Sequence, residues 1–549
     1  MRYALLFALL GGFRPELADT VLFNGRVVTL EPSGVVEAIA IRGDRVLATG
    51  TNAEVEAFAG PRTRRIDLEG KTVTPGFADN HYHGIGGGPG VDLSRTRSLQ
   101  EVIDAIAHRA RETPRGDLVV TNSDWHEGQL REQRLPFRDD LDHATSEHPV
   151  VVVRGGHEYI LNSAALSKWN IDESTRSPDG GRVGRYPNGR LNGELVDTAK
   201  RLAKLPEGES ADAESRLMDL AAELHRLNEA GLTSVRFAGA SPELYRAVEA
   251  LKERGLLTIR VSMLLRIDAA QDPNELETTL DRLGFRPDEG DDWLRVSGIK
   301  LGVDGGFEGG WMREPYEEPY GGGGTFRGLQ TFPTATYIEI VRRLNRQGWR
   351  VATHAVGDAA IDLVLDAYER ANADQSIVGK RFTIEHGFIP REDQFPRMKA
   401  LGVHLSAQHH LYLAAPSLEK YWGGSRARWV TPLRAYLDAG IPVSLGTDSP
   451  VAPYPPLGVL YHFITRDTLS AGTMGEDQRI SRDEALRAMS LGNAALDFSE
   501  QKRGSLVPGK LADLVVLSRD ILTCETTEIL ETKVKLTMVG GHLVFEDSP

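Results

Sequence analysis

The segment Val73-Thr-Pro-Gly-Phe-Ala-Asp-Asn-His-Tyr-His83 decides how this chain of 549 residues is organised. It begins as a short apolar run, which is typical of a strand buried on both faces, and it ends in two histidines. Strand side chains alternate between the two faces of a sheet, so His81 and His83 are expected to point to the same side. An isolated pair of this kind is more often a chance arrangement than a metal site, and the interpretation depends on the rest of the chain.

Seven more apolar runs of strand length follow this segment and alternate with helical patterns. Eight strands that alternate with helices predict an α/β fold, a parallel (β/α)8 barrel of the TIM type. An open doubly wound sheet is the competing architecture, but no G-x-G-x-x-G motif stands at a first strand–helix turn. The expected strands are 73–78, 231–238, 257–265, 296–303, 350–353, 381–385, 403–407 and 441–445.

Both ends of the chain are rich in short strands joined by glycine turns. Residues 20–30 (TVLFNGRVVTL) predict a strand, an Asn-Gly turn and a second strand, and residues 533–544 predict another hairpin at Gly540-Gly541. Neither end has enough strands to bury a core alone, so one composite β-sandwich is favoured over two separate appendages. The expected divisions are sandwich 19–75, barrel 76–504 and sandwich 505–549.

Residues 84–214 make an abnormally long connection between the first two expected barrel strands. A crossover needs only about a dozen residues, so this stretch is expected to hold an inserted subdomain. Its own strands are expected at 117–121 and 149–154, with a glycine-rich hairpin near 180–193. Because the insertion leaves the carboxyl end of strand one, it should lie over the face where barrel enzymes place their sites.

Composition excludes several function classes. Lys plus Arg is 64 against 78 for Asp plus Glu, a formal net charge of −14, and no basic clusters occur, so nucleic acid is not an expected partner. The single cysteine, Cys524, excludes a disulfide framework and a cysteine-rich zinc site. No apolar run approaches the ~20 residues that span a bilayer. The expected partner is a small-molecule substrate, and a homodimer is left open as the assembly.

Residues 1–18 are expected to form an N-terminal extension. MRYALLFALLGG resembles the start of a signal peptide, but the following Phe13-Arg14-Pro15-Glu16 is a poor cleavage site. A misplaced start or a packed arm is therefore favoured over a targeting segment. The expected location is cytoplasmic, with export through this apolar segment as the alternative.

Polar residues of the middle region fall at the ends of the expected strands. Side chains at the carboxyl ends of parallel barrel strands converge on one mouth, and imidazole and carboxylate are ligands for zinc and related divalent ions. Each residue alone has a plainer interpretation, such as a hydrogen-bonded histidine or a helix cap. Their shared placement on strands one, five, six and eight predicts a metal site with His81, His83, His354, His386 and Asp448, and strand four brings Lys300 to the same mouth.

Lys300 is the unusual member of this group. A buried lysine in a strand is costly unless it is paired, and an ion pair with Asp304 is one interpretation. The other is a neutral amine that has reacted with carbon dioxide, since burial favours the neutral form of lysine. The resulting carbamate has two oxygens and a negative charge, so it could bridge two cations.

Taken together, the motifs of the chain resemble those of the amidohydrolase superfamily. They are the opening segment at 73–83, GIKLGVDGG (298–306), ATHAVGDAA (352–360), IEHG (384–387) and LGTDSP (445–450). Their order and style match the amidohydrolase 3 branch, often called YtcJ-like. SLVPGKLADLVVL (505–517) is similar to the segment that returns those chains to their β-sandwich. Some members of the branch are N-substituted formamide deformylases.

The resemblance implies a ligand set and a cofactor. One divalent ion would be held by His81, His83 and Asp448, and a second by His354 and His386, with carboxylated Lys300 as the bridging ligand. Zinc is the expected metal. Mononuclear members exist, so one or two ions per chain are left open.

The implied function is that of a metal-dependent amidohydrolase that hydrolyses a C–N bond in an amide, a formamide or a related group. A bound divalent ion lowers the pKa of its water towards neutrality, so hydroxide is available at pH 7. Asp448 is expected to act as general base towards the attacking water and then as general acid towards the leaving nitrogen. The alternatives are a deaminase of a cyclic amidine and a non-catalytic barrel homologue, although no expected ligand is missing.

Residues that contact substrate are expected in the insertion, in segment 307–326 and after strand seven. Glycines 321–324 beside aromatic residues are equally consistent with a mobile lid over an apolar pocket and with a disordered surface loop. After strand seven the family commonly has Gln-Pro, whereas this chain has Gln408-His409-His410, for which a polar loop is the plainer interpretation. The expected substrate contacts are Trp125, His157, Asp304, Trp311 and Gln408.

Overall fold

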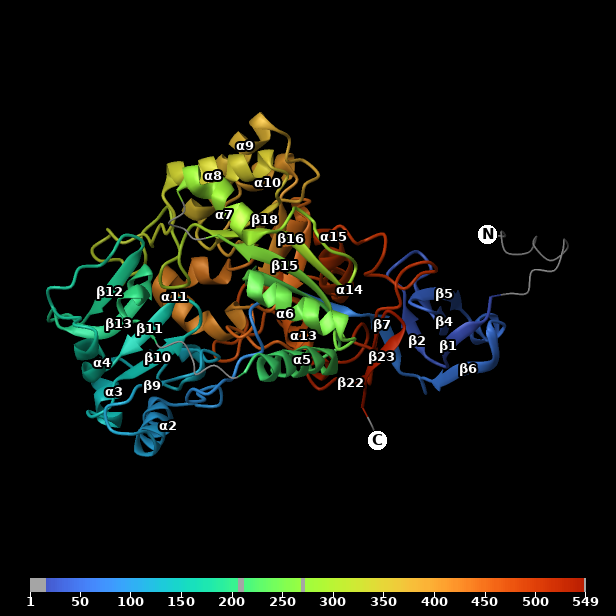
Figure 1. Cartoon of the computed structure of the whole chain (residues 1–549), viewed down its shortest axis with the longest axis horizontal. Helices are drawn as coiled ribbons and strands as arrows, with labels where there is room; N and C mark the ends of the chain where they lie inside the picture. The colour runs from blue at the N-terminus through green and yellow to red at the C-terminus, as the bar shows by residue number, and fades with distance from the viewer. Residues whose placement is uncertain (1–15, 206–211, 268–271, 548–549) are drawn as a thin grey trace.

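The computed structural model describes residues 16–205, 212–267 and 272–547. Along its long axis it has a β-sandwich at one end, a barrel in the middle and an inserted subdomain at the other end (Figure 1). This arrangement confirms the predicted α/β barrel with a composite sandwich and an insertion after the first barrel strand. Most of the predicted extension, 1–18, lies outside the described residues, and strand β1 begins at Ala18.

Eight parallel strands form the central sheet in chain order, from β8 and then β14 through to β20. A bridge between Tyr82 and Ser449 places the last strand beside the first, which closes the barrel. Most of these strands carry buried valine, isoleucine or leucine, as expected for strands covered on both faces. The strands are Phe77–Tyr82, Leu232–Ala240, Arg260–Arg266, Leu294–Gly302, Val351–Ala355, Thr383–His386, His404–Gln408 and Val443–Gly446.

Helices cover the outside of the barrel and bury their apolar faces against its strands. In α8, for example, Tyr337, Ile340 and Leu344 recur at helical spacing and are fully buried. Among the described residues, no helix combines the length and the apolar character needed to cross a bilayer. The helices of this part are α5 (Ala213–Glu229), α6 (Pro242–Glu253), α7 (Leu276–Leu283), α8 (Thr334–Arg346), α9 (Asp358–Asp374), α10 (Phe395–Leu401), α11 (Leu411–Arg428), α12 (Leu433–Asp438), α13 (Pro456–Thr465), α14 (Arg482–Arg487) and α15 (Asn493–Leu496).

The bounds predicted for the first barrel strand, 73–78, are wrong. This run combines most of β7 (Thr72–Pro75), which belongs to the sandwich, with the start of β8 (Phe77–Tyr82). Gly76 separates the two strands, and a Cβ at this position would lie 2.2 Å from the side chain of Thr233. The apolar pattern cannot reveal this change of sheet, because all four residues of β7 and all six of β8 are buried.

The sandwich consists of two sheets, ordered β5-β4-β1-β6 and β23-β22-β21-β7-β2-β3. The second sheet pairs β7 with β21 from the other end of the chain, which confirms the composite sandwich. The hairpin predicted at Asn24-Gly25 is wrong, because β1 and β2 lie in different sheets and this turn is the corner between them. The hairpin predicted at Gly540-Gly541 is confirmed by the antiparallel pairing of β22 and β23. The strands, besides β7, are β1 (Ala18–Phe23), β2 (Arg26–Val28), β3 (Val35–Val36), β4 (Ala38–Arg42), β5 (Arg45–Gly50), β6 (Ala59–Asp67), β21 (Leu514–Leu517), β22 (Val534–Val539) and β23 (His542–Glu546).

The insertion contains a five-stranded sheet, ordered β12-β13-β11-β10-β9, which lies at the left of Figure 1. Both of its predicted strands and its predicted hairpin are present. The strands are β9 (Val119–Val120), β10 (Val150–Arg154), β11 (Glu158–Leu161), β12 (Gly181–Arg185) and β13 (Leu191–Asp197), and the helices are α2 (Leu99–Glu112), α3 (Arg138–Ala144) and α4 (Ser163–Lys168).

Candidate metal centre

A cavity of about 720 Å³ opens at the carboxyl ends of the barrel strands. The insertion contributes part of its wall, including Trp125, Tyr159 and Lys200, so the subdomain covers the barrel mouth as predicted. The structure also brings all six predicted ligands to this one cavity. These are His81, His83, Lys300, His354, His386 and Asp448.

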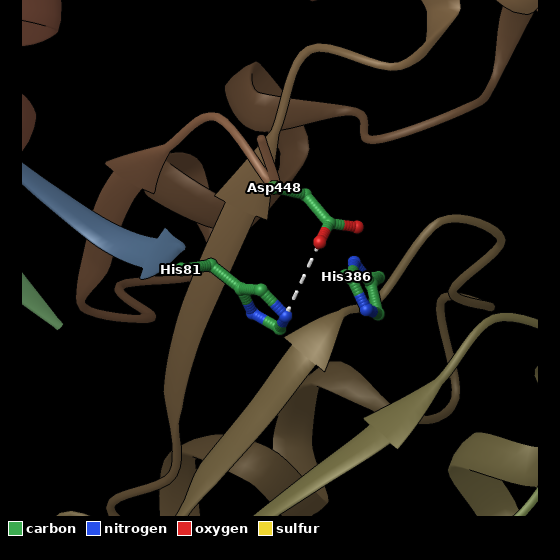
Figure 2. Close-up of side chains that lie close together, drawn as sticks. All are labelled: His81, His386 and Asp448. Atoms are coloured by element: carbon green, nitrogen blue, oxygen red, sulfur yellow. Dashed lines mark ion pairs between the residues drawn. The ribbon is translucent and has the colours of Figure 1, made fainter. Parts of the chain in front are cut away.

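His81, His386 and Asp448 form the tightest group in the cavity. One possible ligand atom from each lies within 4.8 Å of the others, and the three side chains point toward one another (Figure 2). His81 Nε2 is 3.6 Å from Asp448 Oδ1. Zinc–donor distances of about 2 Å place two donors of one ion within roughly 4 Å of each other, which is close to this spacing.

The other three predicted ligands border this group. His83 Nε2 lies 3.2 Å from Asp448 Oδ1, and Lys300 Nζ lies 3.2 Å from His81 Nε2. The ring of His354 is centred 4.6 Å from that of His386. Donors therefore extend from the group on several sides, so that the cavity offers more of them than one tetrahedral ion requires.

The protonation of these side chains suits a divalent cation. Burial lowers the pKa of His81 to about 4 and holds the pKa values of His354 and His386 well below the ordinary value, so the imidazoles are neutral, as ligation requires. Burial also lowers the pKa of Lys300 to about 8. The Nδ1 atom of His386 is buried and has no hydrogen-bond partner among the described residues. These donors fit a divalent metal ion.

Two of the candidate ligands have unusual backbone conformations. His386 has φ 73° and Asp448 has φ 61°, in the left-handed region that residues other than glycine rarely adopt. Such strained positions persist only where the surroundings enforce them, and they concentrate at functional sites. The strain falls on residues at the ends of strands six and eight, so it supports a functional role for this pair.

Asp79 holds the backbone of the site together. Its Oδ1 accepts hydrogen bonds from the backbone N–H groups of His81 and Thr447, each at 3.0 Å. In addition, the N–H of Asp448 donates to the carbonyl of His81 at 2.7 Å, and the N–H of His83 donates to the carbonyl of Ser449 at 2.9 Å. The end of β8 and the loop after β20 are thereby locked to each other.

A buried carboxylate and a guanidinium orient His81 from below. The Nδ1 atom of His81 lies 2.6 Å from Glu385 Oε2, and Arg236 Nη2 donates to Glu385 Oε1 at 2.7 Å. Burial raises the pKa of Glu385, but Arg236 and His81 outweigh it and hold this pKa well below its ordinary value. A ligating histidine that donates its second nitrogen to a carboxylate is the usual arrangement in metal sites.

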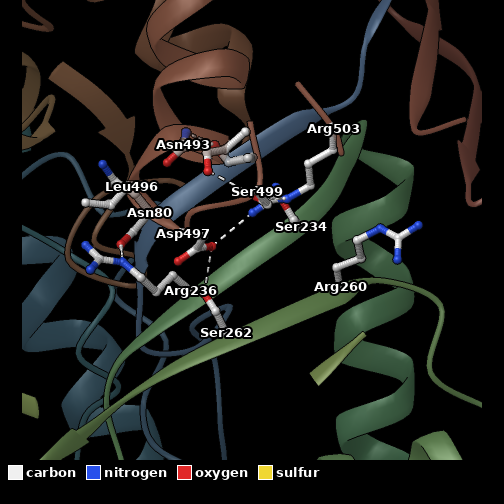
Figure 3. A network of polar contacts seen from close by, with 12 residues as sticks. Asn80, Ser234, Arg236, Arg260, Ser262, Asn493, Leu496, Asp497, Ser499 and Arg503 are labelled. Atoms are coloured by element: carbon white, nitrogen blue, oxygen red, sulfur yellow. Dashed lines mark hydrogen bonds and ion pairs between the residues drawn. The ribbon is translucent and has the colours of Figure 1, made fainter. Parts of the chain in front are cut away.

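Arg236 is one of the residues in the network of polar contacts that Figure 3 shows beneath the site. Its Nε donates to the carbonyl of Asn80 at 2.6 Å. Deeper in the network, Asp497 accepts from Ser262 at 3.0 Å and from Arg503 at 2.9 Å. The position of His81 is therefore tied through Glu385 and Arg236 to the interior of the barrel.

We expect Arg236→Met to weaken metal binding by about 10–100-fold, the range seen when partners of metal ligands are removed. The matched control is Arg260→Met, because Arg260 is equally buried and pairs with Asp513 at the base of the barrel, away from His81. Competition with a chelator measures the metal affinity of both variants. Equal affinities in the two variants would show that Glu385 orients His81 without Arg236.

Three of the residues predicted to contact substrate line the cavity: Trp125, His157 and Asp304. The indole N–H of Trp125 donates to the carbonyl of Val153 at 2.8 Å. His157 Nδ1 lies 2.6 Å from Asp197 Oδ1, and although burial lowers the pKa of His157, this aspartate raises it above the ordinary value.

Asp304 is occupied by the backbone. Its carboxylate accepts from the N–H groups of Trp311 and Gly357 at 2.9 Å and from that of Val356 at 3.0 Å. The carboxylate therefore joins the loop after β16 to the start of α9. The structure shows no ion pair between Asp304 and Lys300 within the described residues; His354 Nε2, at 3.6 Å, lies near its carboxylate instead.

Trp311 and Gln408 stand outside the described cavity wall. Gln408 is fully buried and donates to Ser406 Oγ at 2.9 Å, while Trp311 packs against the barrel core. The glycine-rich stretch beyond Trp311 forms a turn in which Glu318 accepts from the N–H groups of Gly323 and Gly324. Of segment 307–326, only Phe307 reaches the cavity.

His410 lies at the site, although a polar loop was the plainer interpretation of its segment. Its Nε2 atom lies 3.0 Å from Asp448 Oδ2, and its ring is centred 5.8 Å from that of His386. The signal was present, because His409 and His410 follow Gln408 where a proline was expected after the glutamine. Glu385 lies within the quoted IEHG motif, but only the barrel geometry shows that it supports His81.

A parallel barrel with buried histidines and an aspartate at its carboxyl-terminal mouth defines a metal-dependent hydrolase. Residues 64–545 match the amidohydrolase family, and the chain belongs to this family. The chain is 31% identical to an N-substituted formamide deformylase of Arthrobacter pascens, with 97% of this chain and 99% of that protein covered. It is 26% identical to the amidohydrolase YtcJ of Bacillus subtilis, with 94% and 98% covered. An uncharacterised metal-dependent hydrolase from Pyrococcus furiosus has a related structure, with a TM-score of 0.65, 27% identity and coverage of 92% and 100%.

Proposed function

We propose that this metal-dependent hydrolase cleaves the C–N bond of an N-substituted formamide or a related small amide. The observation that carries the proposal is the group of His81, His386 and Asp448, which lies in a cavity large enough for a small organic molecule. The similarity to a deformylase over nearly the whole chain supports the same class of bond. The test of this proposal is to incubate the metal-loaded protein with N-formyl, N-acyl and carbamate compounds. The released formate, acid or amine is then measured.

In this proposal His81, His83 and Asp448 would hold one ion and His354 and His386 a second, and Lys300 as a carbamate would be a ligand shared by both. Zinc is the proposed metal, and its chemistry is to acidify water and to polarise the scissile carbonyl. The lowered pKa of Lys300 supports the carbamate, since only the neutral amine reacts with carbon dioxide.

Asp448 carries the proton transfers of the proposed reaction. Its Oδ1 and Oδ2 face His83 Nε2 and His410 Nε2 at 3.2 and 3.0 Å, so its carboxylate is held in one orientation. It accepts the proton of the attacking water and delivers it to the leaving nitrogen, as a general base and then a general acid. Phe307 and Phe388 lie in the wall and give it apolar surface beside the site.

The metal content separates the two proposed stoichiometries. If carboxylated Lys300 bridges two ions, purified active protein carries close to two divalent ions per chain, and His81→Ala loses metal and activity together. Elemental analysis of the wild type and the variant, each paired with an activity assay, measures this. One ion per chain in a fully active preparation would exclude the bridged pair and leave hydrolysis by a single ion.

A further inference from the structure

One side of the cavity wall carries positive charge that nothing in the wall compensates. Arg266 ends β15, is exposed and lines the cavity. Within the described residues its guanidinium has no hydrogen-bond or ion-pair partner, in contrast to Arg154, which Glu127 and Glu308 bind at 2.8–2.9 Å. Arg154 is thus neutralised, whereas the charge of Arg266 faces the cavity.

The other charged groups of the wall strengthen this asymmetry. Lys200 also lines the cavity; burial lowers its pKa most, Asp197 and Glu308 oppose this shift, and the charge of Arg266 adds to it. The carboxylates of the described wall are already engaged. Asp197 binds His157, Asp304 binds backbone N–H groups and Asp448 lies among the candidate metal ligands.

Arg266 is close enough to the proposed reaction centre for one small molecule to reach both. In the barrel sheet Arg266 is the register partner of Lys300 on the adjacent strand. Both side chains border a space that Gly239 leaves open, since a Cβ there would lie 3.8 Å from Arg266 Cδ and 3.9 Å from Lys300 Cγ. Aromatic residues complete the wall, among them Trp125, Phe307 and Phe388.

We infer that the substrate carries a carboxylate near its scissile C–N bond and that Arg266 binds this carboxylate. The inference rests on the proposed function and adds the chemical class of the substrate, an N-acylated amine with a carboxylate beside the amide and an apolar body. A guanidinium offers two parallel N–H donors that match a carboxylate, and Lys200 adds positive charge to the same side.

The test compares two substrates that differ only in the carboxylate: N-formylphenylalanine, in both enantiomers, and N-formylphenethylamine. Wild-type protein is expected to prefer one enantiomer of the acid. Arg266→Gln should lower kcat/KM for that acid by about 10–100-fold, the range for a hydrogen bond to a charged group, and should lower the value for the neutral amide much less. The control is Arg282→Gln, which removes an exposed arginine of α7 outside the described wall and should change neither value.

Binding to the metal-free protein gives a readout that does not depend on turnover or on metal–carboxylate contacts. Calorimetry should show that 3-phenylpropionate binds more tightly than 3-phenylpropanol, and that Arg266→Gln removes the difference. If neither formamide is cleaved but this binding difference exists, the proposed reaction is wrong and the carboxylate site stands. If the wild type shows no binding difference, or Arg266→Gln retains it, the inference is wrong even where both formamides are cleaved.

Discussion

Replacing Asp448 by asparagine is expected to lower turnover by at least about two orders of magnitude, because general acid–base groups contribute typically ~10²–10⁴-fold. The change keeps nearly the same shape and removes the proton acceptor. His83 and His410 hold the two carboxylate oxygens, so an amide of the same size remains oriented in the site. The remaining ligands stay in place, and the variant should still bind metal and a metal-directed inhibitor.

Steady-state kinetics and metal content, measured on one preparation of Asp448→Asn, test this expectation. Full metal with strongly reduced turnover assigns Asp448 to the chemistry. Loss of metal together with turnover would instead make Asp448 chiefly a ligand. Near-normal turnover with full metal would remove Asp448 from the mechanism and leave it with a structural role in the loop after β20.

The barrel could be predicted from the sequence because its strands bury both faces. Short, largely apolar runs such as that of β15 (Arg260–Arg266) stand out from amphipathic helices such as α7, and their alternation allows few architectures. Boundaries between sheets carry no such signal. Gly76 joins two fully buried strands of different sheets, and Asn24-Gly25 turns a corner with residues that also form hairpins.

The candidate ligands could be predicted because parallel strands bring their carboxyl ends together whatever the sequence separation. Residues that support the site from behind the ligands could not be predicted in this way. Arg236 lies in the middle of β14, where its sequence position resembles any other barrel strand residue, and its link to Glu385 exists only across the barrel. Contacts with substrate depend on side-chain direction within loops, which explains why Trp311 lies outside the described wall.

Removing the side chain of Lys300 is expected to reduce turnover to background, a larger loss than that of Asp448→Asn. Lys300 is buried beside His81 at the bottom of the cavity, and in the proposed function its carbamate binds both ions. Lys300→Ala cannot form that carbamate, so the ions lose their shared ligand. Short carboxylic acids added to this variant could occupy the vacant volume, supply two oxygens and restore part of the activity.

Lys300→Arg separates a carbamate from a simple cation at this position. Arginine keeps the positive charge and has a similar, slightly larger side chain, but its guanidinium stays protonated and cannot react with carbon dioxide. If the carbamate is the functional form, Lys300→Arg is as inactive as Lys300→Ala and both contain less than the wild-type amount of metal. Activity retained in Lys300→Arg would assign the lysine as a cation, and wild-type activity in Lys300→Ala would make it structural. Either result would require another bridging ligand or a single ion, and Lys300 would then serve mainly to fill the barrel beside His81.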